Sequence, residues 1–203
     1  MKSNNIIFIP GYNIDSNCYL IENTLIDTGA GLDENYLTSQ LEKHNIKKED
    51  IDLIINTHCH FDHIGGNYIF ENAEIAIHKL DAIALKNKDT LGTSFNAFEI
   101  HQNNSKVDIE LNDGDTISGF KVIHTPGHTR GGICLWDGVN LISGDTVFAH
   151  GGVGRFDIGG NFQDLKESVH KLTKLDVVNL LPGHGPIAEG NGANHIKLSY
   201  SQF

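Results

Sequence analysis

Residues 51–63 read I-D-L-I-I-N-T-H-C-H-F-D-H, so an apolar run leads directly into four side chains of the kinds that bind metals. The run 51–55 predicts a buried strand. At strand spacing His58, His60 and Asp62 would point the same way, whereas His63 turns off as a helix begins. Such a dense set is more typical of a metal site than of histidines that cap a helix or satisfy core polar groups. The stretch therefore predicts a metal centre where a strand meets a loop.

Three glycine-containing turns in the second half of the chain repeat this design. Each follows a β-like run and offers one ligand-type side chain, which is His128 in T-P-G-H-T (125–129), Asp145 in S-G-D-T (143–146) and His184 in P-G-H-G (182–185). Glycine allows the tight turn that brings such a side chain to a sheet edge. Each turn alone is weak evidence. With the first cluster they supply seven nitrogen and oxygen ligands and no sulfur, enough for two metals near one carboxylate bridge.

Short strands and a few helices are expected around these motifs. Strands are predicted at 6–9, 17–21, 24–27, 51–55 and 74–77, then near 107–111, 119–124, 132–136, 139–142 and 177–181. Helices are predicted over 33–44, 64–70 and 79–88 and from Asn161, where Phe162, Leu165, Val169 and Leu172 form a stripe. The stretch 89–105 is expected to be a long surface loop, which is uncommon unless functional. Strands interleaved with helices suggest two sheets whose outer faces are covered by helices.

Length and composition predict one globular domain over residues 1–203. The chain has 15 basic and 26 acidic residues, and no segment concentrates Lys or Arg. Binding to nucleic acid or to an anionic membrane surface is therefore not expected. No apolar run approaches a membrane span, and the start lacks a signal peptide. The expectation is a soluble, cytoplasmic protein, in agreement with three widely spaced cysteines, Cys18, Cys59 and Cys134.

Taken together, these motifs resemble the metallo-β-lactamase superfamily over nearly the whole chain. The resemblance is carried by H-x-H-x-D-H at 58–63, T-P-G-H-T at 125–129, G-D-T at 144–146 and P-G-H-G at 182–185. Within the superfamily, G-R-F-D at 154–157 is similar to a segment of the single-domain hydrolases related to glyoxalase II. The resemblance implies an α/β fold, an αββα sandwich of two mixed β-sheets with helices on the outer faces. The metals would lie at one edge of the paired sheets.

The resemblance also implies a role for each ligand. His58, His60 and His128 would hold one metal, Asp62, His63 and His184 the other, and Asp145 would bridge both. Zinc is the expected metal, although iron and manganese suit the same ligands. A bound divalent metal lowers the pKa of water from about 15.7 to about 7. A metal-bridging hydroxide would then attack an acyl carbonyl, with Asp62 and Asp145 as the catalytic carboxylates. No G-x-S-x-G turn offers a side-chain nucleophile instead.

Departures from the relatives bear on the substrate. True metallo-β-lactamases commonly offer Cys where this chain has Asp145, and only 19 residues follow His184, too few for the glutathione-binding region of glyoxalase II. Gly185 and Pro186 stand where glyoxalase II has an acidic residue and Tyr. The expectation is a hydrolase that cleaves a small-molecule thioester, ester or lactone. The alternatives are a mononuclear iron persulfide dioxygenase, a lactonase or β-lactamase of broad specificity, and a non-catalytic metal-binding domain.

Residues outside the ligand set have simpler expectations. Arg155, in a glycine-rich loop, is a candidate contact for an anionic substrate group, because its planar fork suits carboxylates; the alternative is a solvated loop residue. Cys59 is expected to pack on the face opposite the ligands. The remaining histidines are expected to be exposed or locally hydrogen-bonded, namely His44, His78, His101, His124, His150, His170 and His195.

Overall fold

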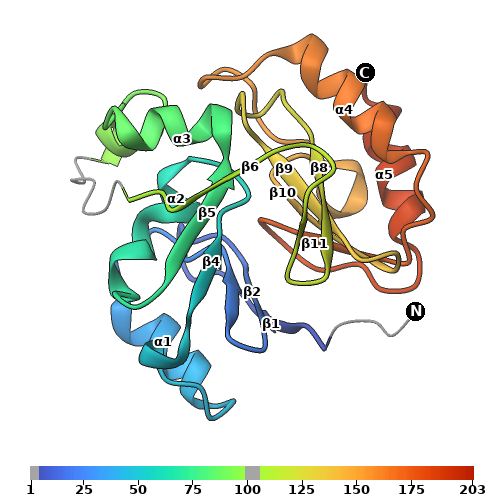
Figure 1. The fold of residues 1–203 in the computed structure, drawn as a ribbon. Coiled ribbons are helices and arrows are strands. Elements are labelled where there is room, and N and C mark those ends of the chain that lie inside the picture. The colour runs from blue at the N-terminus through green and yellow to red at the C-terminus, as the bar shows by residue number, and fades with distance from the viewer. Residues whose placement is uncertain (1–4, 99–105) are drawn as a thin grey trace. The chain divides into compact units, whose positions relative to one another are not determined.

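The computed structural model describes residues 5–98 and 106–203. The described chain divides into two compact units, residues 5–110 and residues 111–203, referred to below as the N-terminal and C-terminal units. Each unit is built on a β-sheet of its own (Figure 1). Both sheets mix parallel and antiparallel strands and carry helices, so the predicted α/β class with two mixed sheets is confirmed. That the two units form one domain stays a prediction.

The sheet of the N-terminal unit has six strands in sequence order. They are β1 (Ile7–Ile9), β2 (Cys18–Ile21), β3 (Thr24–Ile26), β4 (Leu53–Ile55), β5 (Glu74–His78) and β6 (Ile109–Leu111). The first three strands pair antiparallel, whereas β3, β4 and β5 run parallel. Parallel neighbours end at the same edge of a sheet. The residues that follow β3 and β4 are therefore brought together, as the hydrogen bond from Asp27 N to Ile55 O (3.1 Å) shows.

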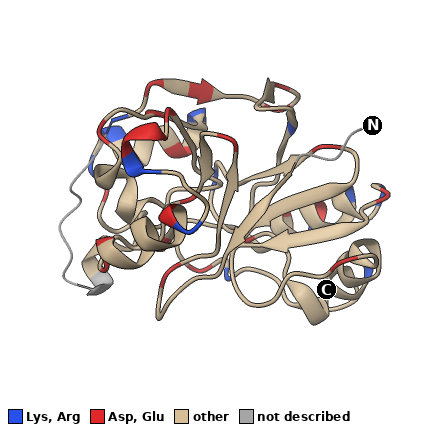
Figure 2. Cartoon of the chain, turned by 90° about the horizontal axis from the view of Figure 1, so that it is seen from below, with Lys and Arg blue, Asp and Glu red and all other residues tan. Residues whose placement is uncertain are grey.

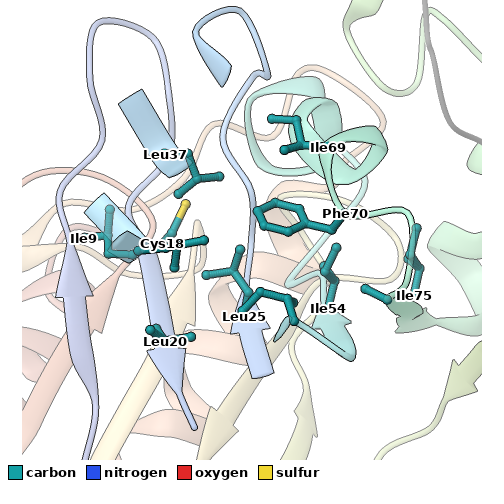
Figure 3. Close-up of a cluster of buried hydrophobic side chains, with 12 residues drawn as sticks. Ile9, Cys18, Leu20, Leu25, Leu37, Ile54, Ile69, Phe70 and Ile75 are labelled. Carbon is teal, nitrogen blue, oxygen red and sulfur yellow. The ribbon is translucent and has the colours of Figure 1, made fainter. Parts of the chain in front are cut away.

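The core of this unit explains why its local sequence folds as it does. Leu25, Ile54 and Ile75 lie side by side across β3, β4 and β5. Figure 3 shows Leu37 and Phe70 turned toward the strand side chains in one cluster. Leu37 belongs to α1 (Glu34–Glu42), the helix predicted over 33–44. The side chain of its N-cap residue, Asp33, accepts from the Tyr36 amide. A second cluster packs α3 (Lys79–Lys86) against β5.

The C-terminal unit contains five strands and two longer helices. The strand order is β11 (Asn179–Pro182), β10 (Asn140–Gly144), β9 (Ile133–Trp136), β8 (Phe120–His124) and β7 (Thr116–Ile117), and only β10 and β11 pair parallel. The helices α4 (Phe162–Leu172) and α5 (Gly192–Tyr200) lie beside this sheet (Figure 1). Leu165 and Val169 of α4 and Ile196 of α5 are fully buried in a cluster with strand residues.

Several elements differ from the sequence prediction. The helix expected over 64–70 begins earlier, as α2 (Phe61–Ile64), and continues as the 3-10 helix η2 (Gly65–Ile69). Its glycines allow close packing, since a Cβ on Gly65 would lie 2.1 Å from Ala30 O. Among the described residues, the strand β7, the helix α5 and the 3-10 helices η1 (Lys48–Asp50) and η4 (Ala149–Gly151) were not predicted. Phe162, first in the predicted stripe of α4, is exposed. The stretch 89–105 was expected to be a surface loop, but its described part is not all at the surface: Thr93, Ser94 and Phe95 are buried, and the 3-10 helix η3 (Phe95–Phe98) forms there. Residues 99–105 lie outside the described chain.

Charged side chains are mixed over the described residues. Figure 2 shows Lys and Arg positions interleaved with Asp and Glu along helices and turns. Within residues 5–98 and 106–203, no helix combines the length and apolar character needed to cross a membrane. The expectations about nucleic acid, membrane surfaces and cellular location stay predictions.

Candidate functional site

Four candidate ligands gather after β4 in the N-terminal unit. His58, His60 and His63 are buried, and the side chain of Asp62 is 19% exposed. The ring centroid of His58 lies 4.9 Å from that of His60 and 4.0 Å from that of His63. Potential ligand atoms of Asp62 and His63 come within 4.8 Å of each other. Asp62 does not continue a strand alternation as expected, because α2 begins at Phe61 and includes both Asp62 and His63.

The N-terminal unit also contains a site residue that the sequence analysis missed. Asp27 follows β3, is buried and has a left-handed backbone conformation (φ 58°). Its Oδ2 lies 2.7 Å from His63 Nδ1 and accepts from Thr57 Oγ1 at 2.7 Å, and its Oδ1 accepts from the Thr57 amide at 2.8 Å. A carboxylate against one imidazole nitrogen fixes the ring and leaves the other nitrogen for a metal. The signal in the sequence was an acidic residue at the end of an apolar strand, next to T-G.

Further buried groups hold the backbone of this cluster. The carbonyl oxygen of His63 accepts from the Thr28 amide (2.8 Å) and from Thr28 Oγ1 (3.1 Å). The amide of Cys59 donates to Asp81 Oδ2 at 3.0 Å. Cys59 itself is buried in the cluster around α3, and burial raises the pKa of its thiol well above the usual range. The prediction that Cys59 packs in the interior is confirmed, and the raised pKa keeps its thiol protonated at neutral pH.

The C-terminal unit brings its three candidate ligands together. His128, Asp145 and His184 follow β8, β10 and β11. Asp145 Oδ2 lies 3.5 Å from His128 Nε2 and 3.5 Å from His184 Nε2. His128 and Asp145 are largely buried, whereas the His184 side chain is 35% exposed. One carboxylate thus faces two imidazoles, a set of nitrogen and oxygen atoms that suits a divalent cation.

The glycine-rich segment after Asp145 supports this cluster through its backbone. The carbonyl oxygen of Arg155 lies 2.6 Å from His128 Nδ1. The ring therefore donates Nδ1–H to this carbonyl and turns Nε2 toward Asp145. Gly154 makes the approach possible, because a Cβ there would lie 1.9 Å from Asp145 O and 2.9 Å from His128 Nδ1. The sequence analysis considered only the side chain of Arg155 and missed this carbonyl.

The side chain of Arg155 is engaged with a neighbour. Its Nε and Nη2 donate to the two carboxylate oxygens of Asp157 at 2.8 and 2.7 Å, and both side chains are 61% exposed. The hydrogen bond from Arg155 is the first cause that lowers the pKa of Asp157 to about 2. An anionic ligand would have to compete with Asp157 for the same fork. A role of Arg155 in substrate binding stays a prediction.

Three of the remaining histidines, His78, His124 and His195, have local hydrogen-bond partners. His78 is buried and its Nδ1 accepts from the Leu80 amide at the start of α3 (3.4 Å). The Nε2 of His124 lies 2.9 Å from the carbonyl oxygen of Arg130, and His195 Nδ1 accepts from the His150 amide at 2.8 Å. His101 lies outside the described residues. His44, His150 and His170 are exposed. The described histidines outside the ligand set are therefore exposed or locally hydrogen-bonded, as expected.

The donor chemistry of both clusters fits a divalent transition metal. Imidazoles and carboxylates suit zinc, iron and manganese. Three of the candidate histidines have Nδ1 beside an oxygen outside the ligand set, which is Thr57 Oγ1 for His58 (3.1 Å), Asp27 Oδ2 for His63 and Arg155 O for His128. Such partners prepare Nε2 for coordination. Each unit by itself therefore presents a cluster of side chains suited to binding a metal.

Comparison with known proteins identifies relatives over most of the chain. The family model described as the metallo-beta-lactamase superfamily matches residues 11–184, a range that includes all seven candidate ligands. A protein of Methanocaldococcus jannaschii named as a probable metallo-hydrolase is 39% identical over 95% of this chain and 98% of its own length. A human acyl-coenzyme A thioesterase is 34% identical to this chain. The matched region covers 63% of this chain and 55% of that enzyme.

Solved structures show the same fold. A protein crystallised in a di-iron-bound form is 26% identical and superposes with a TM-score of 0.76 over 97% of this chain and 96% of its own. A B3 metallo-beta-lactamase is 28% identical, with a TM-score of 0.76 over 90% of this chain and 93% of its own.

Proposed function

Because the chain belongs to the metallo-β-lactamase superfamily, we propose that it is a metallo-hydrolase whose seven candidate ligands hold two divalent metals. The proposal joins the cluster after β4 with the cluster around Asp145 in one dinuclear centre. His58, His60 and His128 would hold one metal, Asp62, His63 and His184 the other, with Asp145 between them. Zinc is the metal we propose, and the di-iron-bound relative supports iron as the alternative.

The observation that carries the proposal is the position of Asp145. Its Oδ2 lies 3.5 Å from Nε2 of both His128 and His184. In the proposed assignment these two histidines belong to different metals. A carboxylate oxygen between them is what a bridging ligand requires. The shared position thus supports two metals on one carboxylate better than one metal with spare ligands.

The chemistry of the proposal divides between metal and protein. When bound, the metals supply a hydroxide at neutral pH and polarise the acyl carbonyl. The chain keeps the ligands oriented, since Asp27 holds His63 and the carbonyl of Arg155 holds His128. We assign to Asp62, whose side chain is partly exposed, the acceptance of a proton from water and its return to the leaving group.

Thioesters are the substrate class that we propose. The human relative named as an acyl-coenzyme A thioesterase supports a thioester, although this chain spans only 55% of it. A thiolate is also a better leaving group than an alkoxide. A hydroxide could therefore displace it directly, and the proposed reaction needs no side-chain nucleophile. Lactones and aryl esters would be secondary substrates.

Metal content gives the first test. The purified chain should contain close to two transition metals, and Asp145→Ala should lose metal from both positions together with activity, because it removes the shared ligand. Asp176→Ala, an exposed carboxylate outside the clusters, should keep the parent stoichiometry. Elemental analysis and metal titration measure both. One tightly bound iron and oxygen uptake with a persulfide would replace the hydrolase by the dioxygenase.

A substrate panel gives the second readout of the same proposal. Acyl-coenzyme A and glutathione thioesters, homoserine lactones, aryl esters and β-lactams would be compared by kcat/KM. Thioesters are expected to exceed β-lactams by at least about 100-fold, which corresponds to about 3 kcal/mol of transition-state stabilisation. A β-lactam that ranks first would contradict the proposed substrate class.

A further inference from the structure

Three buried polar side chains contact one another beside the turns that carry His128 and Asp145 in the C-terminal unit. Thr125 Oγ1 lies 2.9 Å from Thr146 Oγ1 and 3.4 Å from Cys134 Sγ. Cys134 Sγ also lies 3.7 Å from Thr146 Oγ1, and all three residues are at most 2% exposed. These residues, named the hydroxyl–thiol cluster here, belong to neither the candidate ligands nor their direct hydrogen-bond partners.

The hydroxyl–thiol cluster joins the turn of one ligand to the turn of another. Thr146 directly follows Asp145, and Thr125 opens the turn that carries His128. The bond between the two hydroxyls therefore links two segments that are 21 residues apart in the sequence. Cys134, on β9 between the strands that precede the two turns, fills the space beside this bond.

Each of the two turns is closed by its own hydrogen bonds. Ser143 Oγ donates to the carbonyl oxygen of Val147 (2.8 Å), and the Thr146 amide donates to the carbonyl oxygen of Ser143 (3.1 Å). In the other turn the Gly127 amide donates to the carbonyl oxygen of Thr129 (2.8 Å). When two turns are internally constrained, a bond between them contributes to their separation, together with the pairing of β8, β9 and β10. The distance of 3.5 Å between His128 Nε2 and Asp145 Oδ2 would then depend on the two threonine hydroxyls.

The third member, Cys134, is hydrogen-bonded to the backbone of the Asp145 turn. Cys134 Sγ donates to the carbonyl oxygen of Ser143 at 3.5 Å. Burial is the main cause that raises the pKa of this thiol to about 11, so the donor keeps its proton at neutral pH. A buried hydroxyl that loses its partner retains the full cost of its desolvation. Removal of one threonine hydroxyl would leave the other with longer contacts only, which are the Cys134 thiol and, for Thr125, the carbonyl oxygen of Gly132 at 3.4 Å. The loss of the 2.9 Å bond would therefore favour a rearrangement of the turns.

We propose that Thr125 and Thr146, backed by Cys134, are positioning residues that hold His128 and Asp145 at the spacing needed for metal binding. This inference rests on the proposed function, because the spacing matters only if the two side chains are ligands. It adds residues that act through the ligands and that touch neither metal nor substrate.

The test compares isosteric and conservative variants of the full chain. Thr125→Val and Thr146→Val remove the hydroxyl and keep the shape, whereas Thr125→Ser and Thr146→Ser keep the hydroxyl. The control is Ser199→Ala, which removes a buried hydroxyl that donates to the carbonyl oxygen of Gly152 in the same unit (2.8 Å). The dissociation constant for Zn²⁺ is measured by competition with a chromophoric chelator. Urea unfolding of the metal-free proteins reports the fold.

Both valine variants should weaken Zn²⁺ binding by about 10-fold or more, the range found for groups that orient metal ligands. The serine variants should stay within about threefold of the parent, and Ser199→Ala should bind as the parent does even if its unfolding midpoint falls. The double valine variant should lose little more than either single variant, since both remove one bond.

Parent-like affinity in the valine variants overturns the inference, as does an equal loss in Ser199→Ala. If a valine variant fails to fold, the serine variants are used instead. A serine variant that unfolds at the parental urea concentration but binds Zn²⁺ weakly would also contradict the inference, because it keeps the hydroxyl. A parent that binds Zn²⁺ but cleaves no acyl substrate removes the proposed reaction and leaves this measurement valid. A parent that binds no metal overturns both proposals.

Discussion

The Nδ1 atoms of two candidate ligands, His63 and His128, show how these rings are oriented for metal binding. A histidine that binds a metal through Nε2 must present the tautomer with a proton on Nδ1. His63 Nδ1 lies 2.7 Å from a carboxylate oxygen of Asp27, and His128 Nδ1 lies 2.6 Å from the carbonyl oxygen of Arg155. Each partner oxygen accepts a hydrogen bond from Nδ1–H and thereby fixes the orientation of the ring. The ligand residues therefore depend on neighbours that the motifs do not contain.

Asp27→Asn tests this dependence at one residue. Asparagine tolerates the left-handed conformation at position 27 (φ 58°), so backbone strain does not confuse the result. Loss of the carboxylate should weaken metal binding by about 10- to 100-fold, because His63 is no longer held with Nε2 free. Chelator competition measures the affinity, with Asp176→Asn as an exposed control. Unchanged affinity would show that Asp27 serves only the fold.

Among the elements, α4 carries the most direct consequence for the site. It packs against the turn that holds His128, where Ser168 Oγ donates to the carbonyl oxygen of Pro126 (2.7 Å) and the Asn161 amide donates to that of Gly127 (2.8 Å). Gly127 has φ +133°, and a Cβ there would lie 2.2 Å from the backbone nitrogen of Leu165. The start of α4 therefore packs against the His128 turn in direct backbone contact, with no space for a side chain at position 127.

Gly127→Ala should therefore destabilise the chain more than a comparable glycine substitution. Gly185 is the matched control, because it also neighbours a candidate histidine and has a positive φ (+75°), but a Cβ there meets nothing within 4 Å. Gly185→Ala should cost about 1 kcal/mol from backbone strain alone. Gly127→Ala adds a backbone clash and should cost about 3 kcal/mol or more. Urea unfolding with a chelator present measures both, and equal losses would contradict the packing argument.

At the scale of the whole molecule, buried thiols link stability to pH. Cys18, Cys59 and Cys134 are all buried, and burial is the first cause that raises the pKa of each thiol. Between the unfolded and folded pKa values, the folded chain binds more protons than the unfolded chain. The free energy of unfolding therefore has its full thiol contribution below pH 9 and loses it as pH rises.

For Cys134 the loss extends from about pH 9 to about pH 11. Each pKa unit corresponds to about 1.4 kcal/mol, so the chain should lose on the order of 3 kcal/mol through this group alone. Urea unfolding at pH 8, 9 and 10 in the presence of a chelator measures the slope. Cys134→Ala should show a shallower decline over the same range. A parent whose stability does not change from pH 8 to pH 10 would contradict this account.

The sequence alone determined the features whose causes are local. Apolar runs predicted most strands within a residue or two, and helices were predicted to begin at Asp33 and Asn161, which are the N-cap residues of α1 and α4. The seven candidate ligands could be named because each stands in a short motif at the end of a β-like run. Such signals lie within a few neighbouring residues, where hydrogen bonding and side-chain periodicity act. The helix α5 gave no such signal, since its buried positions are Gly192, Ile196 and Ser199 rather than an apolar stripe.

The tertiary structure alone decided which groups support the ligands. Asp27 and His63 are 36 residues apart, and they meet because β3 and β4 run parallel and end at the same edge. Thr125 meets Thr146 for a similar reason, since both follow strands of one sheet. Strand order and register bring such pairs together, and neither is encoded in the residues beside them. A carboxylate or a hydroxyl becomes a positioning group only when a distant strand places a partner within hydrogen-bond distance.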